Sequence, residues 1–460
     1  MIPLRIWRTS SRNSVSFAVS TADSGNVISP EFKSSGNKVI YIEPEYDEND
    51  LPVWDSVRNV FDRVKALIDD KKAVSVWAVG FGGVAEAVAK MSLGNHIGFR
   101  FDKQLGEKAL FYPKYGAFVC ELDGDPFTTE TVIGVTTDEY EIDCRAYKVD
   151  MNEVQSAWEK KLEPVFPVNA KEESKSAKVY TYPAATLSQH ASAFAKPKVL
   201  IPVFPGTNCE YDTARVFERA GADPETVVIK NLTGASLEDS VKYFEKAVKK
   251  SQIIMIPGGF SGGDEPDGSG KFITAFFRNP RIRDAVTELL DNRDGLMLGI
   301  CNGFQALIKL GLVPFGKITD MTDDSPTLTF NTIARHQSMM VSTKVCSNKS
   351  PWLAGCDVGD VHKIAISHGE GRFVASEELI AQLAANGQIA TQYVDLDGVA
   401  SMDIRFNPNA SYDAIEGITS PDGRVLGKMG HSERIGFDVC KNVPGNKDQK
   451  IFESGVAYFK

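Results

Sequence analysis

The stretch Leu298-Gly299-Ile300-Cys301-Asn302-Gly303-Phe304-Gln305 decides the fold, because it joins a strand pattern to a helix pattern. The apolar run 295–298 before it predicts a buried parallel strand. After it, apolar residues recur at helical spacing as far as Ile308, and Gly311 is placed to end that helix. Cys301 is therefore expected on a tight turn, held against the positive end of the helix dipole. That position favours the thiolate, which is the nucleophilic form of cysteine.

A cysteine by itself is weak evidence for catalysis, because free cysteine is most often a small buried apolar residue. Here four fixed positions form the pattern Gly-x-Cys-x-Gly-x-Gln. From ordinary residue frequencies, this pattern should arise by chance in roughly one chain in several hundred. Gly299 and Gly303 also allow the backbone to approach closely on both sides of the turn. The pattern therefore favours a nucleophile at Cys301 over a packing residue.

The composition of the 460 residues is that of a globular protein with two or three domains. The formal charge of -10 argues against a nucleic-acid or anionic membrane surface. The first residues contain no signal-peptide pattern, and polar residues interrupt the longest apolar stretch, so no membrane span is predicted. Seven cysteines without close pairs predict reduced thiols in a cytoplasmic protein, without a zinc site.

Residues 1–165 are predicted to form one α/β unit. Strand patterns lie at 15–19, 38–42, 74–79, 97–101, 117–122 and 132–136, and helix patterns at 54–68, 84–91 and 151–162. The second helix follows Gly80-Phe81-Gly82-Gly83, which could cradle a phosphate at a helix N-terminus. Because this segment lacks the Lys-Ser/Thr of a P-loop and the spacing of a dinucleotide fingerprint, we favour a tight strand-to-helix turn.

The composition changes after this unit. Residues 166–195 are polar, contain several prolines and lack an apolar period, which is typical of a linker. From residue 196 onward, strand and helix patterns alternate. The strands are expected at 199–204, 226–230, 253–256 and 295–298, and the helices up to 220, at 237–248 and over 271–291. This alternation predicts a parallel sheet, with the site at the carboxyl ends of its strands.

Three stretches follow strand patterns and should meet at that edge of the sheet. They are Pro205-Gly206-Thr207-Asn208-Cys209-Glu210, Gly258-Gly259-Phe260-Ser261-Gly262-Gly263-Asp264 and the turn at Cys301. An oxyanion hole needs backbone N–H donors. We expect one donor from Gly258-Gly259 and the other from Asn302, directly after the nucleophile.

A cysteine nucleophile also needs a base and a group that orients the base. His431 and Glu433 lie on one side of a strand pattern, so the carboxylate can bond one imidazole nitrogen and leave the other facing Cys301. The tripeptide alone is more often a surface feature. His368, which shares a glycine-flanked segment with Glu370, is the alternative base or part of a site loop.

Residues 196–460 resemble a class I (triad) glutamine amidotransferase domain, an α/β fold with a flavodoxin-like parallel sheet. Four segments narrow the resemblance to the glutaminase domain of the large phosphoribosylformylglycinamidine synthases. They are residues 258–264, Asn208-Cys209-Glu210-Tyr211-Asp212, His368-Gly369-Glu370-Gly371-Arg372-Phe373 and Phe406-Asn407-Pro408-Asn409. Residues 1–165 resemble, with less specific motifs, the C-terminal half of an aminoimidazole ribonucleotide synthetase-like fold, which that enzyme family also contains.

The resemblance implies that Cys301, His431 and Glu433 form a triad that releases ammonia from L-glutamine, while Gln305 helps to hold the substrate. The family uses this ammonia, with ATP and Mg²⁺, to convert formylglycinamide ribonucleotide (FGAR) to the amidine (FGAM) in purine biosynthesis. No ATP site, other cofactor site or metal site is expected in this sequence. The chain therefore resembles the C-terminal portion of the enzyme, as a fragment or a separately encoded piece, and the remaining synthetase domains are its expected partner.

One departure and three alternatives accompany this interpretation. Many family members have Pro-His-Pro-Glu where this sequence has Gly430-His431-Ser432-Glu433, so we expect a differently shaped loop. The alternatives are a cysteine hydrolase of the same superfamily, a glutaminase that serves another synthetase, and an intact but silent site without its activating domains. The hydrolase relatives place His directly after the nucleophile, and this sequence has Asn302 there.

Overall fold

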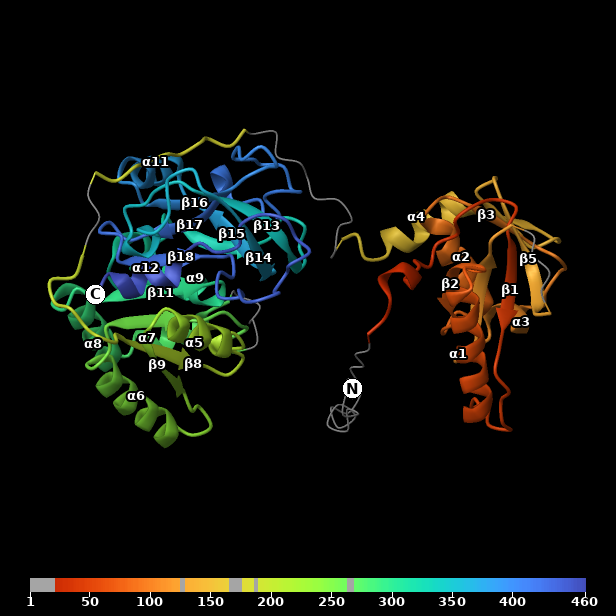
Figure 1. Cartoon of the computed structure of the whole chain (residues 1–460), viewed down its shortest axis with the longest axis horizontal. Coiled ribbons are helices and arrows are strands. Elements are labelled where there is room, and N and C mark those ends of the chain that lie inside the picture. Colours follow the sequence, from red (N-terminus) through yellow and green to blue (C-terminus); the bar gives the residue numbers. More distant parts are fainter. Residues whose placement is uncertain (1–20, 125–128, 165–175, 186–188, 263–268) are drawn as a thin grey trace, which may run out of the picture. The chain divides into compact units, whose positions relative to one another are not determined.

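The computed structural model describes residues 21–124, 129–164, 176–185, 189–262 and 269–460 (Figure 1). It divides into two compact units, Met1–Pro164 and Val165–Lys460. Some predicted features lie outside the described residues: the strand at 15–19, residues 166–175 and 186–188 of the linker, and Gly263-Asp264 of one site loop. Within the described ranges, no helix is long and apolar enough to cross a membrane.

The first unit contains a seven-stranded sheet in the order β2-β4-β1-β5-β3-β6-β7. All neighbouring strands are antiparallel except β3 and β6. The strands are β1 (Lys38–Ile42), β2 (Ala73–Ala78), β3 (Gly98–Phe101), β4 (Phe118–Leu122), β5 (Thr131–Thr137), β6 (Glu141–Asp143) and β7 (Lys148–Asp150). The sequence patterns predicted the first five of these and missed β6 and β7.

Helices cover both faces of this sheet. They are α1 (Trp54–Asp69), α2 (Gly83–Leu93), α3 (Glu107–Phe111) and α4 (Met151–Lys160). In β1, Ile40 belongs to the apolar cluster beneath α1, and Val39 belongs to the cluster beneath α2. Because successive strand residues point to opposite faces, α1 and α2 lie on opposite sides of the sheet. The sequence predicted α1, α2 and α4 and missed the short α3.

The glycine cluster before α2 forms the turn that the sequence favoured. Gly83 has a φ of +68°, and a Cβ there would lie 2.5 Å from the Leu110 carbonyl oxygen. The Gly82 N–H donates to the Glu86 carboxylate at 2.8 Å. A carboxylate therefore already occupies the N-terminus of this helix, where a phosphate would have to bind.

The second unit is built on a nine-stranded sheet in the order β14-β13-β16-β17-β18-β11-β10-β8-β9. Its strands are β8 (Lys198–Val203), β9 (Asp223–Val228), β10 (Ile253–Ile256), β11 (Leu296–Ile300), β13 (Gln337–Val345), β14 (Val361–His368), β16 (Ile389–Tyr393), β17 (Ile415–Thr419) and β18 (Val425–Lys428). A separate two-stranded sheet pairs β12 (Thr327–Phe330) with β15 (Glu370–Val374).

The expectation of a parallel sheet is confirmed for β8, β9, β10 and β11, which the sequence patterns predicted, and is wrong for four of the nine strands. Strands β18, β11, β10, β8 and β9 are parallel, whereas β14, β13, β16 and β17 join antiparallel. The five residues between β17 and β18 are too few for a crossover helix, so these two strands must run antiparallel. Strand β10 is buried along its whole length, as expected of a parallel strand with both faces covered.

The helices of the second unit are α5 (Glu210–Arg219), α6 (Gly234–Val248), α7 (Lys271–Phe277), α8 (Pro280–Asp291), α9 (Asn302–Leu310), α10 (Leu312–Phe315), α11 (Glu377–Ala385) and α12 (Ile451–Ala457). The helix expected over 271–291 is two helices. Asn279 is the N-cap of α8 and its side chain accepts the Arg281 N–H. Pro280 follows at the first helical position, where its missing N–H costs nothing and where a continuing helix would break.

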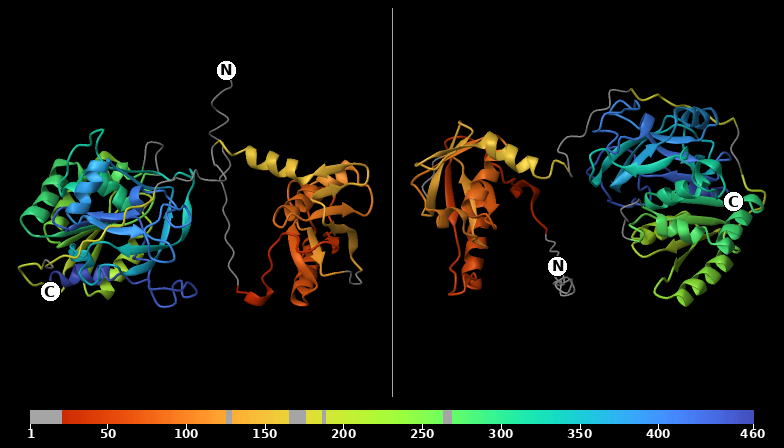
Figure 2. Two further views of the ribbon diagram at one scale, coloured as in Figure 1. Left: turned by 90° about the horizontal axis from the view of Figure 1, so that it is seen from above. Right: turned by 180° about the vertical axis from the view of Figure 1, so that it is seen from behind.

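The described part of the expected linker packs along the second unit, which is visible as the yellow trace in Figure 2. The Tyr180 hydroxyl donates to the Asp413 carboxylate at 2.5 Å, and the Tyr180 N–H donates to Gln392 at 3.0 Å. Near residue 190, the His190 N–H donates to the Tyr458 carbonyl at 2.9 Å. These contacts hold residues 176–185 and 189–195 against the unit that carries Cys301.

Candidate active site

Cys301 lies between β11 and α9, in a strained backbone conformation. Its φ is +54° and its ψ is -105°, a combination that residues with a side chain rarely adopt. The Cys301 N–H donates to the Lys428 carbonyl at 2.9 Å, and the Cys301 carbonyl accepts the Gln305 N–H at 3.0 Å. A Cβ at Gly303 would lie 2.0 Å from the Ile256 carbonyl oxygen. Glycine is therefore required there for α9 to start so close to β10.

His431 and Glu433 form a buried pair beside this turn. The Nδ1 of His431 lies 2.6 Å from the Glu433 carboxylate, and the His431 N–H donates to the Ala365 carbonyl at 2.8 Å. Burial alone would lower the pKa of His431, but the charges of Glu433 and Cys301 raise it well above the ordinary value. Burial opposes ionisation of Glu433, yet the His431 charge and hydrogen bond lower the pKa of that carboxyl group. The pair is therefore an ion pair.

Cys301 lies on the Nε2 side of the His431 ring, but no hydrogen bond of ordinary length joins the two side chains. The buried Nε2 of His431 has no partner among the described residues, although the Cys301 charge is close enough to raise the pKa of His431. Catalytic hydrogen bonds are often long before substrate binds. The structure thus brings together the three residues of the expected triad, with Nδ1 bonded to the carboxylate and Nε2 left for the thiol.

Gly258 lies at the centre of this group. A Cβ at this position would lie 2.7 Å from His431 Cε1 and 3.5 Å from Cys301 Cβ. Its carbonyl accepts the Asn208 N–H at 3.3 Å, and the Phe260 N–H donates to Gly206 at 2.8 Å. These two bonds fix the chain on either side of Gly259. On the other side of the thiol, Asn302 begins α9, where helix N–H groups have no acceptor within the helix.

A chain of hydrogen bonds joins the turn at Cys301 to Glu370, the first residue of β15. Asn302 Nδ2 donates to Gln305 Oε1 at 2.9 Å, and Gln305 Nε2 donates to the Glu370 carbonyl at 2.6 Å. The Glu370 carboxylate accepts the Ser269 N–H at 2.9 Å. The expected substrate-binding residues are thus adjacent. Both the oxygen and the nitrogen of the Gln305 side-chain amide are thus hydrogen-bonded to other residues of the chain.

His368 also lies near the site. The Cys301 thiol donates to the Ser367 carbonyl at 3.6 Å, which places the end of β14 beside this thiol. Burial, and after it the charges of His431 and His336, lower the pKa of His368 to about 3. Neither ring nitrogen has a partner among the described residues. His368 is therefore neutral and lacks the orienting carboxylate that His431 has.

Cys209 and Arg434 are two neighbours of the triad to which the sequence patterns assigned no role. Cys209 Sγ lies 3.9 Å from His431 Nδ1, and Arg434 Nη2 donates to Cys209 Sγ at 3.4 Å. Cys209 belongs to the stretch 205–210, which follows a strand pattern. That stretch was the sequence signal that placed Cys209 near the site. No sequence signal pointed to Arg434, which follows Glu433 directly.

Within the part of the chain that the structure describes, two groups of side chains have the spacing of metal ligands. In Cys209, His431 and Glu433, one ligand atom from each residue lies within 4.8 Å of the others. There, Glu433 already bonds His431 and the Arg434 guanidinium faces the sulfur, which opposes a second cation. The other group is Cys356, Asp360 and His362, which contains none of the expected site residues. The absence of a metal site stays a prediction.

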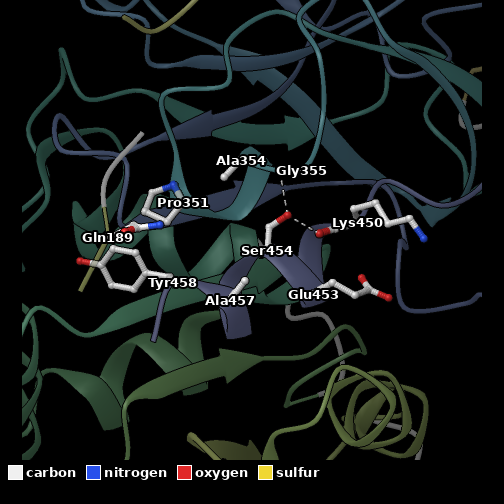
Figure 3. Close-up of a pocket in the computed structure, with 9 residues that line it drawn as sticks. All are labelled: Gln189, Pro351, Ala354, Gly355, Lys450, Glu453, Ser454, Ala457 and Tyr458. Carbon is white, nitrogen blue, oxygen red and sulfur yellow. Dashed lines mark hydrogen bonds between the residues drawn. The ribbon is translucent and has the colours of Figure 1, made fainter. Parts of the chain in front are cut away.

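The cavity drawn in Figure 3 is separate from this site. It has a volume of about 480 Å³. The Ser454 hydroxyl accepts the Gly355 N–H and donates to the Lys450 carbonyl there, as the dashed lines show. Its lining residues are Gln189, Pro351, Ala354, Gly355, Lys450, Glu453, Ser454, Ala457 and Tyr458. No expected site residue is among them, so this cavity lies apart from the expected glutamine site.

Comparison with known proteins places the chain in a family. Residues 196–459 match the CobB/CobQ-like glutamine amidotransferase domain. The phosphoribosylformylglycinamidine synthase subunit PurQ of Methanococcus maripaludis is 37% identical over 246 residues, which make up 53% of this chain and 85% of that subunit. The PurQ subunit of Aquifex aeolicus is 31% identical over 254 residues, 54% of this chain and 95% of that subunit.

A solved structure described as PurLQS from Thermotoga maritima is 26% identical, with a TM-score of 0.42, and the match covers 58% of this chain and 100% of that chain. The family match and the identity to the two subunits carry the assignment. The chain belongs to the glutamine amidotransferase family and, within it, to the group that contains the PurQ subunits of phosphoribosylformylglycinamidine synthase.

Proposed function

We propose that this chain is the glutaminase of a phosphoribosylformylglycinamidine synthase, in which it hydrolyses L-glutamine to supply ammonia for the conversion of FGAR to FGAM. The relatives named PurQ support the biological role. The observation that carries the chemistry is the buried pair of His431 and Glu433, with Nδ1 and carboxylate 2.6 Å apart, beside a cysteine on a strained strand-to-helix turn.

The first half of the proposed reaction forms a thioester. Cys301 reacts as the thiolate, with its proton held by the charged His431 at Nε2, and attacks the side-chain amide carbon of glutamine. Backbone N–H groups of Gly259 and Asn302 hold the oxyanion that forms. His431 then returns its proton to the departing nitrogen, so the C–N bond breaks and ammonia leaves. Glu433 holds the imidazole in the required orientation and stabilises its charged form.

The second half restores the enzyme. His431 takes a proton from water, which attacks the thioester carbon while the same N–H groups hold the oxyanion. The C–S bond breaks and glutamate leaves. Neither half needs a metal or a cofactor in this chain. Gln305 and Glu370, which are joined by a hydrogen bond, would form one wall of the glutamine pocket.

The ammonia acceptor lies in the synthetase part of the enzyme. We assign the binding of FGAR, ATP and Mg²⁺ to that part, because the glycine turn before α2 is closed by Glu86 and no P-loop is present in the sequence. We further propose that residues 1–165 correspond to the C-terminal half of an aminoimidazole ribonucleotide synthetase-like fold. The seven free cysteines agree with a reducing compartment such as the cytoplasm.

A nitrogen-source experiment tests this function. The chain is combined with the synthetase part, FGAR and ATP-Mg²⁺, and FGAM formation is measured with either glutamine or ammonium chloride. Cys301→Ser should abolish the glutamine-dependent reaction and leave the ammonia-dependent reaction intact. Glutamine-dependent FGAM formation by Cys301→Ser would contradict the assignment, and so would hydrolysis of glutamine without transfer to FGAR.

A further inference from the structure

We propose that Lys428 and Glu416 are positioning residues for His431. As a buried ion pair they hold both chain neighbours of the catalytic histidine, and thereby fix where its imidazole lies relative to Cys301. The inference rests on the proposed glutaminase function. We call these two residues, with the hydrogen bonds they make to residues 430 and 432, the Lys428–Glu416 clamp.

Both members of the clamp are buried. Lys428 ends β18 and Glu416 lies in the neighbouring strand β17, and each side chain belongs to a residue that is only 1% exposed. Lys428 Nζ lies 3.3 Å from the Glu416 carboxylate. Taking two charges out of water costs several kcal/mol per ion, so an apolar pair would serve stability at least as well. The charges therefore need an explanation other than stability.

The hydrogen bonds of the clamp converge on the residues that flank His431. Lys428 Nζ donates to the Gly430 carbonyl at 2.8 Å and to the Ser432 hydroxyl at 3.0 Å. Glu416 accepts the Gly430 N–H at 2.6 Å. An ammonium group has three donors, and all three face an acceptor here: Gly430, Ser432 and Glu416. The chain is thus held immediately before and immediately after the imidazole.

The clamp depends on the residues that distinguish this loop. Glycine at position 430 supplies the N–H that Glu416 accepts, and a proline would have none. A Cβ at Gly430 would lie 3.0 Å from Glu416 Oε1 and 3.1 Å from Lys428 Nζ. Ser432 supplies the hydroxyl that Lys428 bonds, and that hydroxyl donates onward to Gln449 at 2.5 Å. The loop 430–433, which contains no proline, is therefore fixed by hydrogen bonds to the buried Lys428 and Glu416 side chains.

The same lysine also bonds the nucleophile. The Lys428 carbonyl accepts the Cys301 N–H at 2.9 Å, while its side chain holds the His431 loop. One residue thus ties the turn that carries the thiol to the loop that carries the base. Displacement of a catalytic group by about 1 Å can cost on the order of a hundredfold in rate, so a loosened clamp should lower the rate without changing the glutamine pocket.

The test separates positioning from stability. Lys428→Met alone leaves Glu416 buried without its partner and should lower both the melting temperature and kcat. The double variant Lys428→Met/Glu416→Gln removes both charges and keeps an acceptor for the Gly430 N–H, so its melting temperature should recover. We expect its kcat to stay about 10- to 100-fold below that of the parent, with KM for glutamine within about twofold. Lys344→Met, which removes a lysine that bonds Gly398, is the matched control and should keep the parental kcat.

A milder variant guards against loss of folding. Ser432→Ala removes one hydroxyl and should lower kcat about fivefold, at unchanged KM, through the loss of one charge-assisted bond. The inference is overturned if kcat of the double variant recovers with its melting temperature, if KM changes as much as kcat, or if Ser432→Ala has the parental kcat. Failure of the proposed function would show instead in the parent chain, as an absence of glutaminase activity with the synthetase part present.

Discussion

The Lys428 carbonyl accepts the backbone N–H of Cys301 at 2.9 Å, although the two residues are far apart in the sequence. The bond extends the ladder between β18 and β11, in which Ile300 pairs with Lys428. Because Lys428 is followed directly by the loop of His431, adjacent parallel strands bring Cys301 and His431 to the same edge of the sheet. The proximity of Cys301 to the loop that carries His431 therefore follows from this strand pairing.

Alkylation should identify the nucleophile. A diazo-ketone analogue of glutamine is expected to label Cys301 alone, because only this cysteine combines the strained turn, the start of α9 and a neighbouring imidazole. Cys209 is the informative rival, since it lies 3.9 Å from the same imidazole, and the exposed Cys440 reports non-specific reaction. Peptide mass spectrometry gives the site. Label found chiefly on Cys209 or Cys440 would refute the assignment.

Substitution of the base should separate His431 from His368. His431→Ala should abolish glutamine turnover, whereas Glu433→Gln should cost less, because an amide can still hold Nδ1 but no longer stabilises the charged ring. His368→Ala should retain turnover by the triad. Steady-state ammonia release from the three variants decides the matter. An active His431→Ala together with an inactive His368→Ala would transfer the role to His368.

Local patterns predicted the strand, turn and helix around Cys301 well. The apolar run, the glycines and the helical period around Cys301 are all set by neighbours in sequence, and they placed β11 and α9 within two residues of their observed positions. The division of 271–291 into two helices was missed, although Pro280 marks it in the sequence. The three-residue strands β6 and β7 are too short to leave a pattern.

Features set by long-range pairing were not accessible in the same way. The antiparallel half of the large sheet depends on which strands meet, and periodicity alone does not specify partners. Lys428 ends the apolar run Val425-Leu426-Gly427, where a lysine is ordinarily interpreted as the exposed end of a strand. Its burial follows from Glu416 on the adjacent strand, a pairing that becomes visible only in the folded chain.

Acid stability should reveal the buried His368. Its pKa is lowered to about 3, first by burial and then by the charges of His431 and His336, whereas in the unfolded chain it is about 6.5. Between these values the unfolded chain binds a proton that the folded chain excludes, so the free energy of unfolding falls as the pH drops below 6.5. His368→Asn should reduce this fall by up to about 1.4 kcal/mol per pH unit. Urea unfolding at pH 7 and at pH 5 measures the change in the free energy of unfolding between these two pH values. An equal change in the parent and in His368→Asn would contradict the burial of a neutral imidazole.

Nucleotide binding should be weak or absent in this chain. The N-terminus of α2 is the place where the sequence could have cradled a phosphate, and there the Gly82 N–H is bonded to Glu86. A phosphate would meet this carboxylate as a like charge. Calorimetry with ATP and Mg²⁺ should therefore give no tight binding to the full chain. Tight binding that persists in Glu86→Gln, with the same affinity, would mean that the nucleotide site lies elsewhere in these residues.

Glutamine hydrolysis by this chain should be slow alone and should rise when the synthetase part is added. Three features of the structure favour this. His431 Nε2 makes no hydrogen bond among the described residues, and the amide of Gln305 is bonded to Asn302 and Glu370. Gly259 and Gly262, which follow Gly258 in the chain, have φ values of +151° and +73°, and glycines permit more than one backbone state.

A partner that binds one of these states more tightly shifts the population toward it. A preference of about 1.4 kcal/mol for the competent state would raise the rate about tenfold. Ammonia release is measured for the chain alone, with the synthetase part, and with an unrelated protein of similar charge. Cys301→Ser with the synthetase part reports any contaminating glutaminase. A rate that the synthetase part leaves unchanged would show that the site is already in its competent arrangement in the isolated chain.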